Sequence, residues 1–168
     1  ACVAGLCAVP CDPRSPCAPG LACTRLEDGV YCAPPAPPPP PIEMGSTGEG
    51  AEAVVTGSVS YGSAYEGPPG CVHGGFIAAS FDEVLGFVQS MSGQPGMTAN
   101  LQIDYRSPTP LHRPLRFVGR IDRIEGRKIF TEATLHHGDT LCAQARGLFV
   151  SMKPEVFDRL MKGRPSAG

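Results

Sequence analysis

Hydrophobic and polar positions follow two different periods in the part of the chain beyond residue 50. Between Phe76 and Met91, apolar side chains recur every three or four residues, which is the spacing of an amphipathic α-helix. A stripe of this kind buries one face of a helix against a sheet. The predicted stripe consists of Ile77, Phe81, Val84, Val88 and Met91.

Five other segments alternate apolar and polar residues, which predicts β-strands. One of them precedes the helix, and four follow it with short turns between the last three. This order is typical of an α+β fold in which an antiparallel sheet wraps around one long central helix. The predicted strands are Ala53–Tyr61, Thr98–Tyr105, Leu115–Ile124, Lys128–His136 and Thr140–Val150, and a short terminal helix is predicted for Pro154–Lys162.

The face of the helix opposite the apolar stripe is composed of small residues and one carboxylate. Small side chains allow a partner helix or a ligand to approach the backbone closely. Glu83 is expected to be an ordinary solvated residue, whereas Asp82 is the carboxylate placed for chemistry on this face. The small residues beside Asp82 are Gly75, Ala78, Ala79 and Gly86.

A turn rich in glycine and proline, GPPGCVHGG at residues 67–75, leads into the helix. The free N–H groups at the start of a helix lie at the positive end of its dipole and can stabilise an oxyanion. An HGG tripeptide alone is weak evidence, because it also suits a tight turn with a hydrogen-bonded histidine. Together with Asp82 on the same helix, it indicates an acyl-transfer or hydrolysis centre.

Helix geometry limits how such a centre can be built. Gly75 and Asp82 lie at nearly the same angle around the helix, but seven rises separate them by about 10.5 Å along its axis. Both groups must lie about 3 Å from the reacting atoms. Two antiparallel copies of the helix across a two-fold axis would bring Gly75 of one chain near Asp82 of the other. We therefore expect the site to lie between the subunits of a homodimer or a dimer of dimers.

The first 50 residues differ in composition from the rest. Residues 33–41 read APPAPPPPP, which predicts a stiff polyproline II spacer, and GSTGEG at residues 45–50 predicts a flexible continuation. The chain is therefore divided into a Cys-rich segment at 1–32, a Pro/Gly-rich linker at 33–50 and a globular domain at 51–168.

Six of the eight cysteines lie in the Cys-rich segment. An even number of cysteines in a short stretch, without a CxxC pair or a histidine, favours a disulfide framework over a zinc site. An unfolded or mis-joined segment is the third alternative. These cysteines are Cys2, Cys7, Cys11, Cys17, Cys23 and Cys32.

Charge and hydropathy exclude two broad classes of function. The formal net charge is −2 and there is no basic tract, so nucleic acid is not an expected partner. No run of about 18 apolar residues is present, so no transmembrane segment is expected. The absence of an initiator methionine and of a signal sequence suggests a fragment or a processed form.

Three motifs, in order and at matching spacing, resemble the hotdog-fold acyl-CoA thioesterases. They are GPPGCVHGGFIAASFDEVLG at 67–86, MTANLQIDYRSPTPL at 97–111 and IEGRKIF at 124–130. The resemblance covers residues 61–150. It is strongest to the PaaI-like branch that includes the mitochondrial long-chain acyl-CoA thioesterases related to the carboxyl-terminal modulator protein. The Cys-rich segment has no counterpart in that family.

The resemblance implies hydrolysis of acyl-CoA to a free acid and CoA, with no cofactor and no metal. It implies that Asp82 acts as the general base or nucleophile and that Thr98 assists it. It also implies that the Gly75 N–H polarises the thioester carbonyl, with His73 and Gly74 shaping the turn.

Coenzyme A carries phosphates, so cations are expected along its path. The resemblance suggests Arg127 and Lys128 for this contact and Arg106 as a second candidate, although solvated turn cations are an equally good reading. Further residues expected to contact the substrate are Gly74, Asn100 and Asp104. Many relatives carry an asparagine six residues before the histidine of HGG, where this chain has Gly67.

Two alternative functions remain open from the sequence. A hotdog acyl-thioester dehydratase or hydratase would use a histidine and a carboxylate, but the lone Asp82 favours the hydrolase. A non-catalytic, extracytoplasmic Cys-rich binding protein is the other alternative. A cytoplasmic location is expected for the thioesterase domain, and an extracytoplasmic one if the Cys-rich segment belongs to the chain.

Overall fold

The computed structural model describes residues 2–3, 6–7, 9–10, 22–26, 29–33, 38, 40–94, 96–153, 155–156 and 159 of the 168. The chain divides into two compact units, Ala1–Pro38 and Pro39–Gly168. The terminal helix predicted for Pro154–Lys162 falls largely outside the described residues, as do the side chains of the Cys-rich segment.

The first unit consists of short antiparallel strands. The register places Cys2 opposite Cys7 and Cys23 opposite Cys32. Directly opposed residues of antiparallel strands have Cα atoms about 4.5–5.5 Å apart, which is within the range that a disulfide spans. The disulfide framework stays a prediction. The strands form a pair, β1 (Cys2–Val3) with β2 (Leu6–Cys7), and a sheet in the order β3 (Val9–Pro10), β5 (Gly29–Ala33), β4 (Ala22–Leu26).

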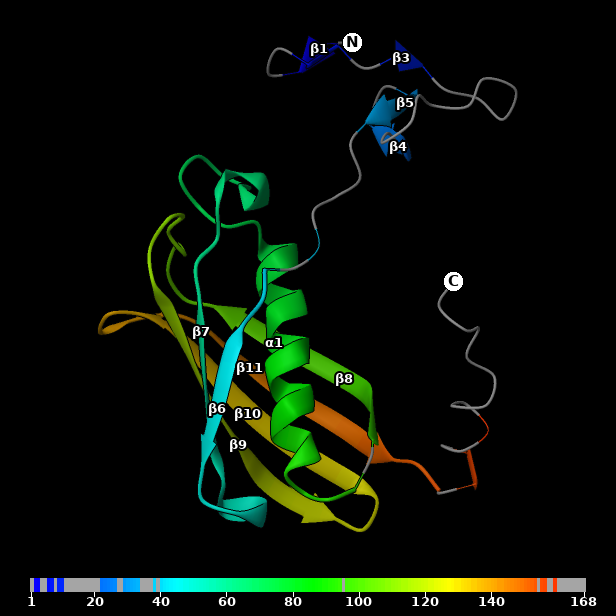
Figure 1. Ribbon diagram of the computed structural model, residues 1–168, viewed down its shortest axis with the longest axis vertical. Helices are drawn as coiled ribbons and strands as arrows, with labels where there is room; N and C mark the ends of the chain where they lie inside the picture. Colours follow the sequence, from blue (N-terminus) through cyan, green and yellow to red (C-terminus); the bar gives the residue numbers. More distant parts are fainter. Residues whose placement is uncertain are drawn as a thin grey trace. The chain divides into compact units, whose positions relative to one another are not determined.

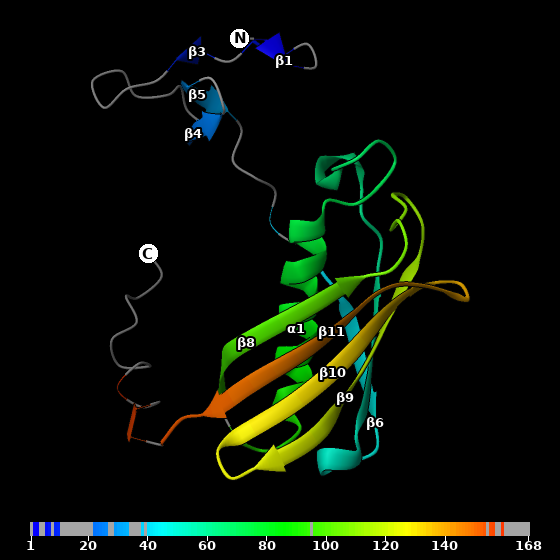
Figure 2. The same cartoon turned by 180° about the vertical axis from the view of Figure 1, so that it is seen from behind.

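The second unit is one antiparallel sheet of six strands with one long helix, α1, against one face (Figures 1 and 2). The predicted α+β architecture is therefore confirmed. The strands, in sheet order, are β6 (Glu43–Thr47), β7 (Val54–Val59), β9 (Leu115–Glu125), β10 (Lys128–His137), β11 (Thr140–Ser151) and β8 (Gly96–Tyr105).

Helix α1 spans Gly74–Ser90 and begins two residues before the predicted start. Four of the five residues of the predicted stripe are buried, Leu85 is buried beside them, and Met91 is only partly buried. The apolar period therefore identified the core face correctly. Within the described part of the chain, no helix combines the length and the apolarity that crossing a membrane requires.

Glycines in the central strands allow α1 to lie close to the sheet. A Cβ atom on Gly119 of β9 would lie 2.8 Å from Val88 Cγ2. A Cβ atom on Gly147 of β11 would lie 3.2 Å from Leu85 Cδ1 and 2.8 Å from Thr131 Oγ1. The two distances to side chains of α1, 2.8 Å to Val88 and 3.2 Å to Leu85, are shorter than ordinary contacts, so the helix and the sheet are in close contact at their centre.

The predicted linker at 33–50 is wrong in its second half. Strand β6 pairs with the edge of β7, and Pro40 and Ile42 are buried in the second unit. The composition of residues 45–50 indicated flexibility, because segments rich in glycine and serine behave as flexible linkers. The open edge of β7 offers a row of hydrogen-bond partners, which a local pattern does not reveal.

Candidate functional site

The open face of α1 carries a carboxylate that is hydrogen-bonded to a strand residue. Thr98 Oγ1 donates to Asp82 Oδ1 at 2.9 Å. Both residues are exposed in the single chain. No described residue binds the second carboxylate oxygen, Oδ2, which is left for water or a ligand. The structure therefore brings together two of the predicted site residues.

A β-bulge turns Thr98 toward the helix. Leu101, Ile103 and Tyr105 lie on the helix side of β8, so strict alternation would put Thr98 on the opposite side. The register with β11 shifts after Leu148, so that Thr98 lies opposite buried Phe149. The intervening Ala99 is the extra residue of the bulge, and bulges often redirect a side chain next to a functional site.

At the start of α1, the N–H group that is free to bind a substrate is not the predicted one, that of Gly75. The Gly75 N–H donates to Nδ1 of His73, the N-cap residue, at 3.0 Å, so it is already engaged. The Phe76 N–H donates to the His73 carbonyl oxygen at 3.0 Å. Among the described residues, the Gly74 N–H has no acceptor. The open donor is therefore that of Gly74, and His73 is a helix cap.

Tyr105, at the end of β8, was not singled out from the sequence. Its phenolic O–H donates to the Gly74 carbonyl oxygen at 2.7 Å. Partial burial raises the pKa of Tyr105, so the phenol remains a donor across the neutral range. The sequence feature that could have identified Tyr105 is an aromatic residue with a polar hydroxyl at the end of a predicted strand, on the same side as the apolar residues.

No side chain fits at residue 67, the position of the asparagine expected from the resemblance. A Cβ atom on Gly67 would lie 2.8 Å from His73 Cα. The backbone of the loop closes on itself here, because the Gly67 N–H donates to the Cys71 carbonyl oxygen at 2.9 Å. The site must therefore work without a side chain from residue 67.

The loop after β8 supports the turn that precedes α1. The Val72 N–H donates to the Thr109 carbonyl oxygen at 2.9 Å, and the Leu111 N–H donates to the Gly70 carbonyl oxygen at 3.2 Å. His112, which has a positive φ of 55°, donates its N–H to the Tyr61 carbonyl oxygen at 2.8 Å. The sequence reasoning missed this support, because hydrogen bonds between two irregular loops leave no periodic signal.

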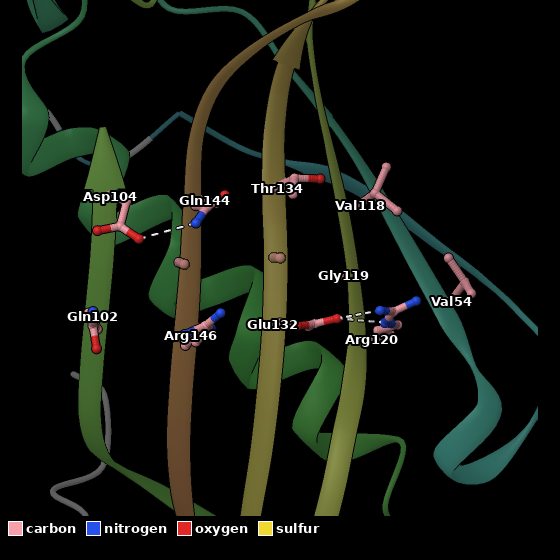
Figure 3. A pocket seen from close by; sticks show the side chains of 12 residues that line it. Val54, Gln102, Asp104, Val118, Gly119, Arg120, Glu132, Thr134, Gln144 and Arg146 are labelled. Carbon is pink, nitrogen blue, oxygen red and sulfur yellow. Dashed lines mark hydrogen bonds and ion pairs between the residues drawn. The ribbon is translucent and has the colours of Figure 1, made fainter. Parts of the chain in front are cut away.

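Two predicted substrate contacts lie on the other face of the sheet. Asp104 accepts a hydrogen bond from Gln144 Nε2 at 3.1 Å and lines a groove of about 370 Å³ on the face away from α1 (Figure 3). Asn100 lies opposite Leu148 and shares that outer face. Within one chain these two residues therefore do not share the Asp82 side of the sheet, and their contact with the substrate stays a prediction. Side chains alternate between the two faces along β8. Leu101 lies on the helix side, so Asn100 and Asp104 point to the opposite face.

The predicted cations lie at opposite ends of β8. Arg127 Nε donates to the Ser151 carbonyl oxygen at 2.9 Å, which attaches the β9–β10 turn to the end of β11 beside the start of β8. Lys128, next to it, is exposed. Arg106 follows the other end of β8 and is 3.5 Å from Asp104. At about 3.3 Å per residue, the length of β8 separates Arg106 from the other two.

The groups that could carry out acid–base or nucleophilic chemistry lie in two separate places on α1. The oxyanion donor is at its first residue, and the carboxylate is near its middle. The Gly74 N–H and the Asp82 carboxylate are separated by eight rises, or about 12 Å, along α1. One chain therefore cannot bring both to one carbonyl. Among the described residues, no group of three or more His, Cys, Asp or Glu side chains is arranged to hold a metal ion.

Residues 69–144 match the family model of the thioesterase superfamily. Acyl-coenzyme A thioesterase THEM4 of Bos taurus is 39% identical over 92 residues, which is 54% of this chain and 38% of the bovine protein. THEM4 of Rattus norvegicus is 41% identical over 92 residues, covering 54% of this chain and 40% of the rat protein. The chain thus spans about two fifths of the length of these curated relatives.

Solved structures share the arrangement of sheet and helix. A thioesterase superfamily protein has a TM-score of 0.62 at 40% identity, over 66% of this chain and 56% of that chain. A Streptococcus mutans protein bound to acetyl CoA has a TM-score of 0.61 at 19% identity, over 67% of this chain and 89% of its own, which shows a common fold. Residues 69–144 are thus similar in sequence to the thioesterase superfamily, and the second unit is similar in fold to a solved protein of that superfamily.

Proposed function

We propose that this protein hydrolyses acyl-CoA thioesters to a free carboxylic acid and CoA, without a cofactor. The observation that carries the proposal is the Thr98–Asp82 hydrogen bond on the open face of α1. Relatives that are 39% and 41% identical are acyl-coenzyme A thioesterases, and a protein of the same fold binds acetyl CoA. Coenzyme A would enter only as part of the substrate.

In the proposed reaction, the Gly74 N–H donates a hydrogen bond to the thioester carbonyl oxygen. Asp82 Oδ2 takes a proton from a water molecule, whose oxygen attacks the carbonyl carbon. The tetrahedral intermediate then collapses, the carbon–sulfur bond breaks, and the CoA thiolate leaves and takes the proton that Asp82 Oδ2 accepted from water. Thr98 keeps the carboxylate oriented through Oδ1. Direct attack by Asp82, through an anhydride that water then hydrolyses, would use the same groups.

We infer that the two halves of the site meet across a homodimer, alone or within a dimer of dimers. β8 is an edge strand of the described sheet, and Met97 and Tyr105 on it are 57% and 53% exposed. Antiparallel pairing of two β8 edges near Leu101 would bring Thr98 of each chain beside Tyr105 of the other. Asp82 of one chain would then lie near Gly74 of its partner.

The same pairing supports a path for the nucleotide part of CoA. It would bring Arg106 of one chain toward the β9–β10 turn of the partner, which carries Arg127 and Lys128. Arg106 and the Arg127–Lys128 pair, which lie at opposite ends of β8 in one chain, would then line one phosphate-binding edge. A dehydratase is less well supported, because the relatives at 39% and 41% identity are acyl-coenzyme A thioesterases.

The test is a complementation assay with two inactive variants. Asp82→Asn removes the base. Gly74→Pro removes the N–H at the first helical position, where proline is tolerated. The preceding His73, at φ −64° and ψ 133°, already has the extended conformation that proline requires. Each variant alone should be nearly inactive toward an acyl-CoA.

After subunit exchange, random mixing should produce heterodimers in half of the molecules, each with one intact site. The expected activity is therefore about a quarter of that of the wild type. No recovery despite proven exchange would show that the groups act within one chain. Full activity of Asp82→Asn would instead refute the assignment of the carboxylate.

A further inference from the structure

Side chains hold the peptide between Gly74 and Gly75 at both of its ends. Tyr105 donates its phenolic O–H to the Gly74 carbonyl oxygen at 2.7 Å, and His73 Nδ1 accepts from the Gly75 N–H at 3.0 Å. The two side chains come from different parts of the fold, because Tyr105 ends β8 and His73 precedes α1. The plane of this peptide is therefore set by tertiary contacts as well as by the helix.

We propose that Tyr105 is a positioning residue that keeps the start of α1 in the orientation that presents the Gly74 N–H to the substrate. This inference rests on the proposed function. Two consecutive glycines have no Cβ atoms, so the peptide between them rotates with little steric resistance. The first turn of a helix also has the fewest hydrogen bonds to resist such a rotation.

A rotated peptide would harm the reaction directly. The Gly74 carbonyl oxygen carries a partial negative charge, and a rotation that turned it toward the substrate would oppose the developing oxyanion. Stabilisation of an oxyanion depends on donors that are already oriented before the reaction. By binding this oxygen, the Tyr105 O–H keeps it on the β8 side of the helix start.

The absence of side chains at Gly74 and Gly75 leaves space for the Tyr105 and His73 side chains. A Cβ atom on Gly74 would lie 3.2 Å from the Tyr105 hydroxyl oxygen, and one on Gly75 would lie 3.1 Å from His73 Nδ1. Each glycine thus leaves room for the side chain that binds its own backbone group. This explains why both positions are glycine, although glycine weakens a helix.

Strand β8 therefore contacts both halves of the proposed site. Thr98 near its start binds the carboxylate of Asp82, and Tyr105 at its end binds the first turn of α1. Pairing of β8 with a partner strand would therefore place both contacts at the same interface. Tyr105 couples the position of that strand to the first turn of α1, which carries the oxyanion donor.

The experiment compares Tyr105→Phe with Ser90→Ala in the full chain. Tyr105→Phe keeps the ring and removes the O–H. Ser90→Ala is the matched control, because Ser90 Oγ donates to the Phe87 carbonyl oxygen at 2.6 Å, another exposed bond between a hydroxyl and the backbone of α1. Hydrogen exchange of the Gly75 amide is measured by NMR, and kcat and KM are measured with decanoyl-CoA.

For Tyr105→Phe we expect exchange of the Gly75 amide to be about tenfold faster and kcat to fall about fivefold, as for the loss of one hydrogen bond. KM should stay within about twofold of the wild-type value, because the substrate-binding surface is retained. Ser90→Ala should leave the exchange of Gly75, kcat and KM unchanged, and the two variants should unfold at similar temperatures.

Unchanged exchange at Gly75 in Tyr105→Phe would overturn the proposed role of Tyr105. Faster exchange with unchanged kcat would show that the peptide is held for stability alone, which also overturns it. A parallel rise in KM would assign Tyr105 to substrate binding instead. If the wild-type protein hydrolyses no acyl-CoA, the proposed function fails, and the exchange measurement still decides whether Tyr105 holds the peptide.

Discussion

On its core side α1 carries large apolar side chains, whereas on its open side it carries small residues and one carboxylate. Phe81, Val84 and Leu85 on the core side are completely buried. Ala79 and Asp82 on the open side are exposed. The two sides belong to the same helix and differ only by a rotation about its axis, so local backbone preference does not explain the difference.

One glycine on each side of α1 shows how tightly that side is packed. Gly147 faces the core side of α1, and an added Cβ would lie 2.9 Å from the Phe149 ring and 3.2 Å from Leu85 Cδ1. Gly86 lies on the open side, and an added Cβ there would meet nothing within 4 Å. Packing within the chain therefore requires the first glycine and not the second. Packing within the described chain therefore does not constrain Gly86, one of the small residues of the open side.

The largest expected effect is on the open side, and it concerns activity. Asp82→Asn keeps the size of the side chain and an acceptor for Thr98 but cannot accept a proton. Hydrolysis of an acyl-CoA should fall by about 10³-fold or more, with an unchanged unfolding temperature. Glu83→Gln, one residue later and also exposed, is the control and should retain activity. An equal loss in both variants would mean that general charge matters there, rather than one base.

Thr98→Ala should have the next largest effect. It removes the hydroxyl that donates to Asp82 Oδ1, and kcat should fall about tenfold to a hundredfold. Thr98→Ser keeps the hydroxyl and should recover most of the activity, which steady-state kinetics would show. If the serine variant were as impaired as the alanine variant, the methyl group rather than the hydrogen bond would be responsible.

Gly147→Ala should affect the core side, and it concerns stability. The new methyl group must displace Thr131 or Phe149, which costs about 1–3 kcal/mol of unfolding free energy. Urea denaturation of the purified protein measures this change. A neutral result would show that the contact between α1 and the sheet is looser than the structure indicates.

A glycine-to-alanine substitution on the open side should stabilise the protein instead of destabilising it. Gly86→Ala adds a methyl group in open space and improves helix propensity, so unfolding free energy should rise by about 0.5–1 kcal/mol. The comparison of the two faces fails if Gly86→Ala destabilises a single chain. A loss that appears only at concentrations where the protein assembles would show that a second subunit covers this glycine.

The smallest expected effect comes from removing the first unit. Deletion of residues 1–38 ends before the buried Pro40 and Ile42, so it leaves the second unit complete. Unfolding temperature and acyl-CoA hydrolysis should both stay at their full-length values. A change in either would contradict the expectation that the second unit folds and functions without the first.

The sequence by itself determined the helix, the five strands around it and the side of the helix that is buried. These features have short periods, and burial of an apolar stripe is the dominant local rule. The choice of Asp82 also followed from the sequence, because it is the one carboxylate among small residues. The three ordered motifs indicated a resemblance to the hotdog-fold thioesterases before any spatial information was available.

Tertiary structure alone decided which groups meet. The bulge at Ala99 turned Thr98 toward Asp82, although the alternation of β8 put it on the outer face with Asp104. The His73 cap occupied the Gly75 N–H and left that of Gly74 open. Strand β6 pairs with β7 in the sheet, although its composition predicted a flexible linker. Each of these outcomes depends on a hydrogen bond or strand register whose formation is decided by neighbouring elements, and a local sequence pattern carries no information about such partners.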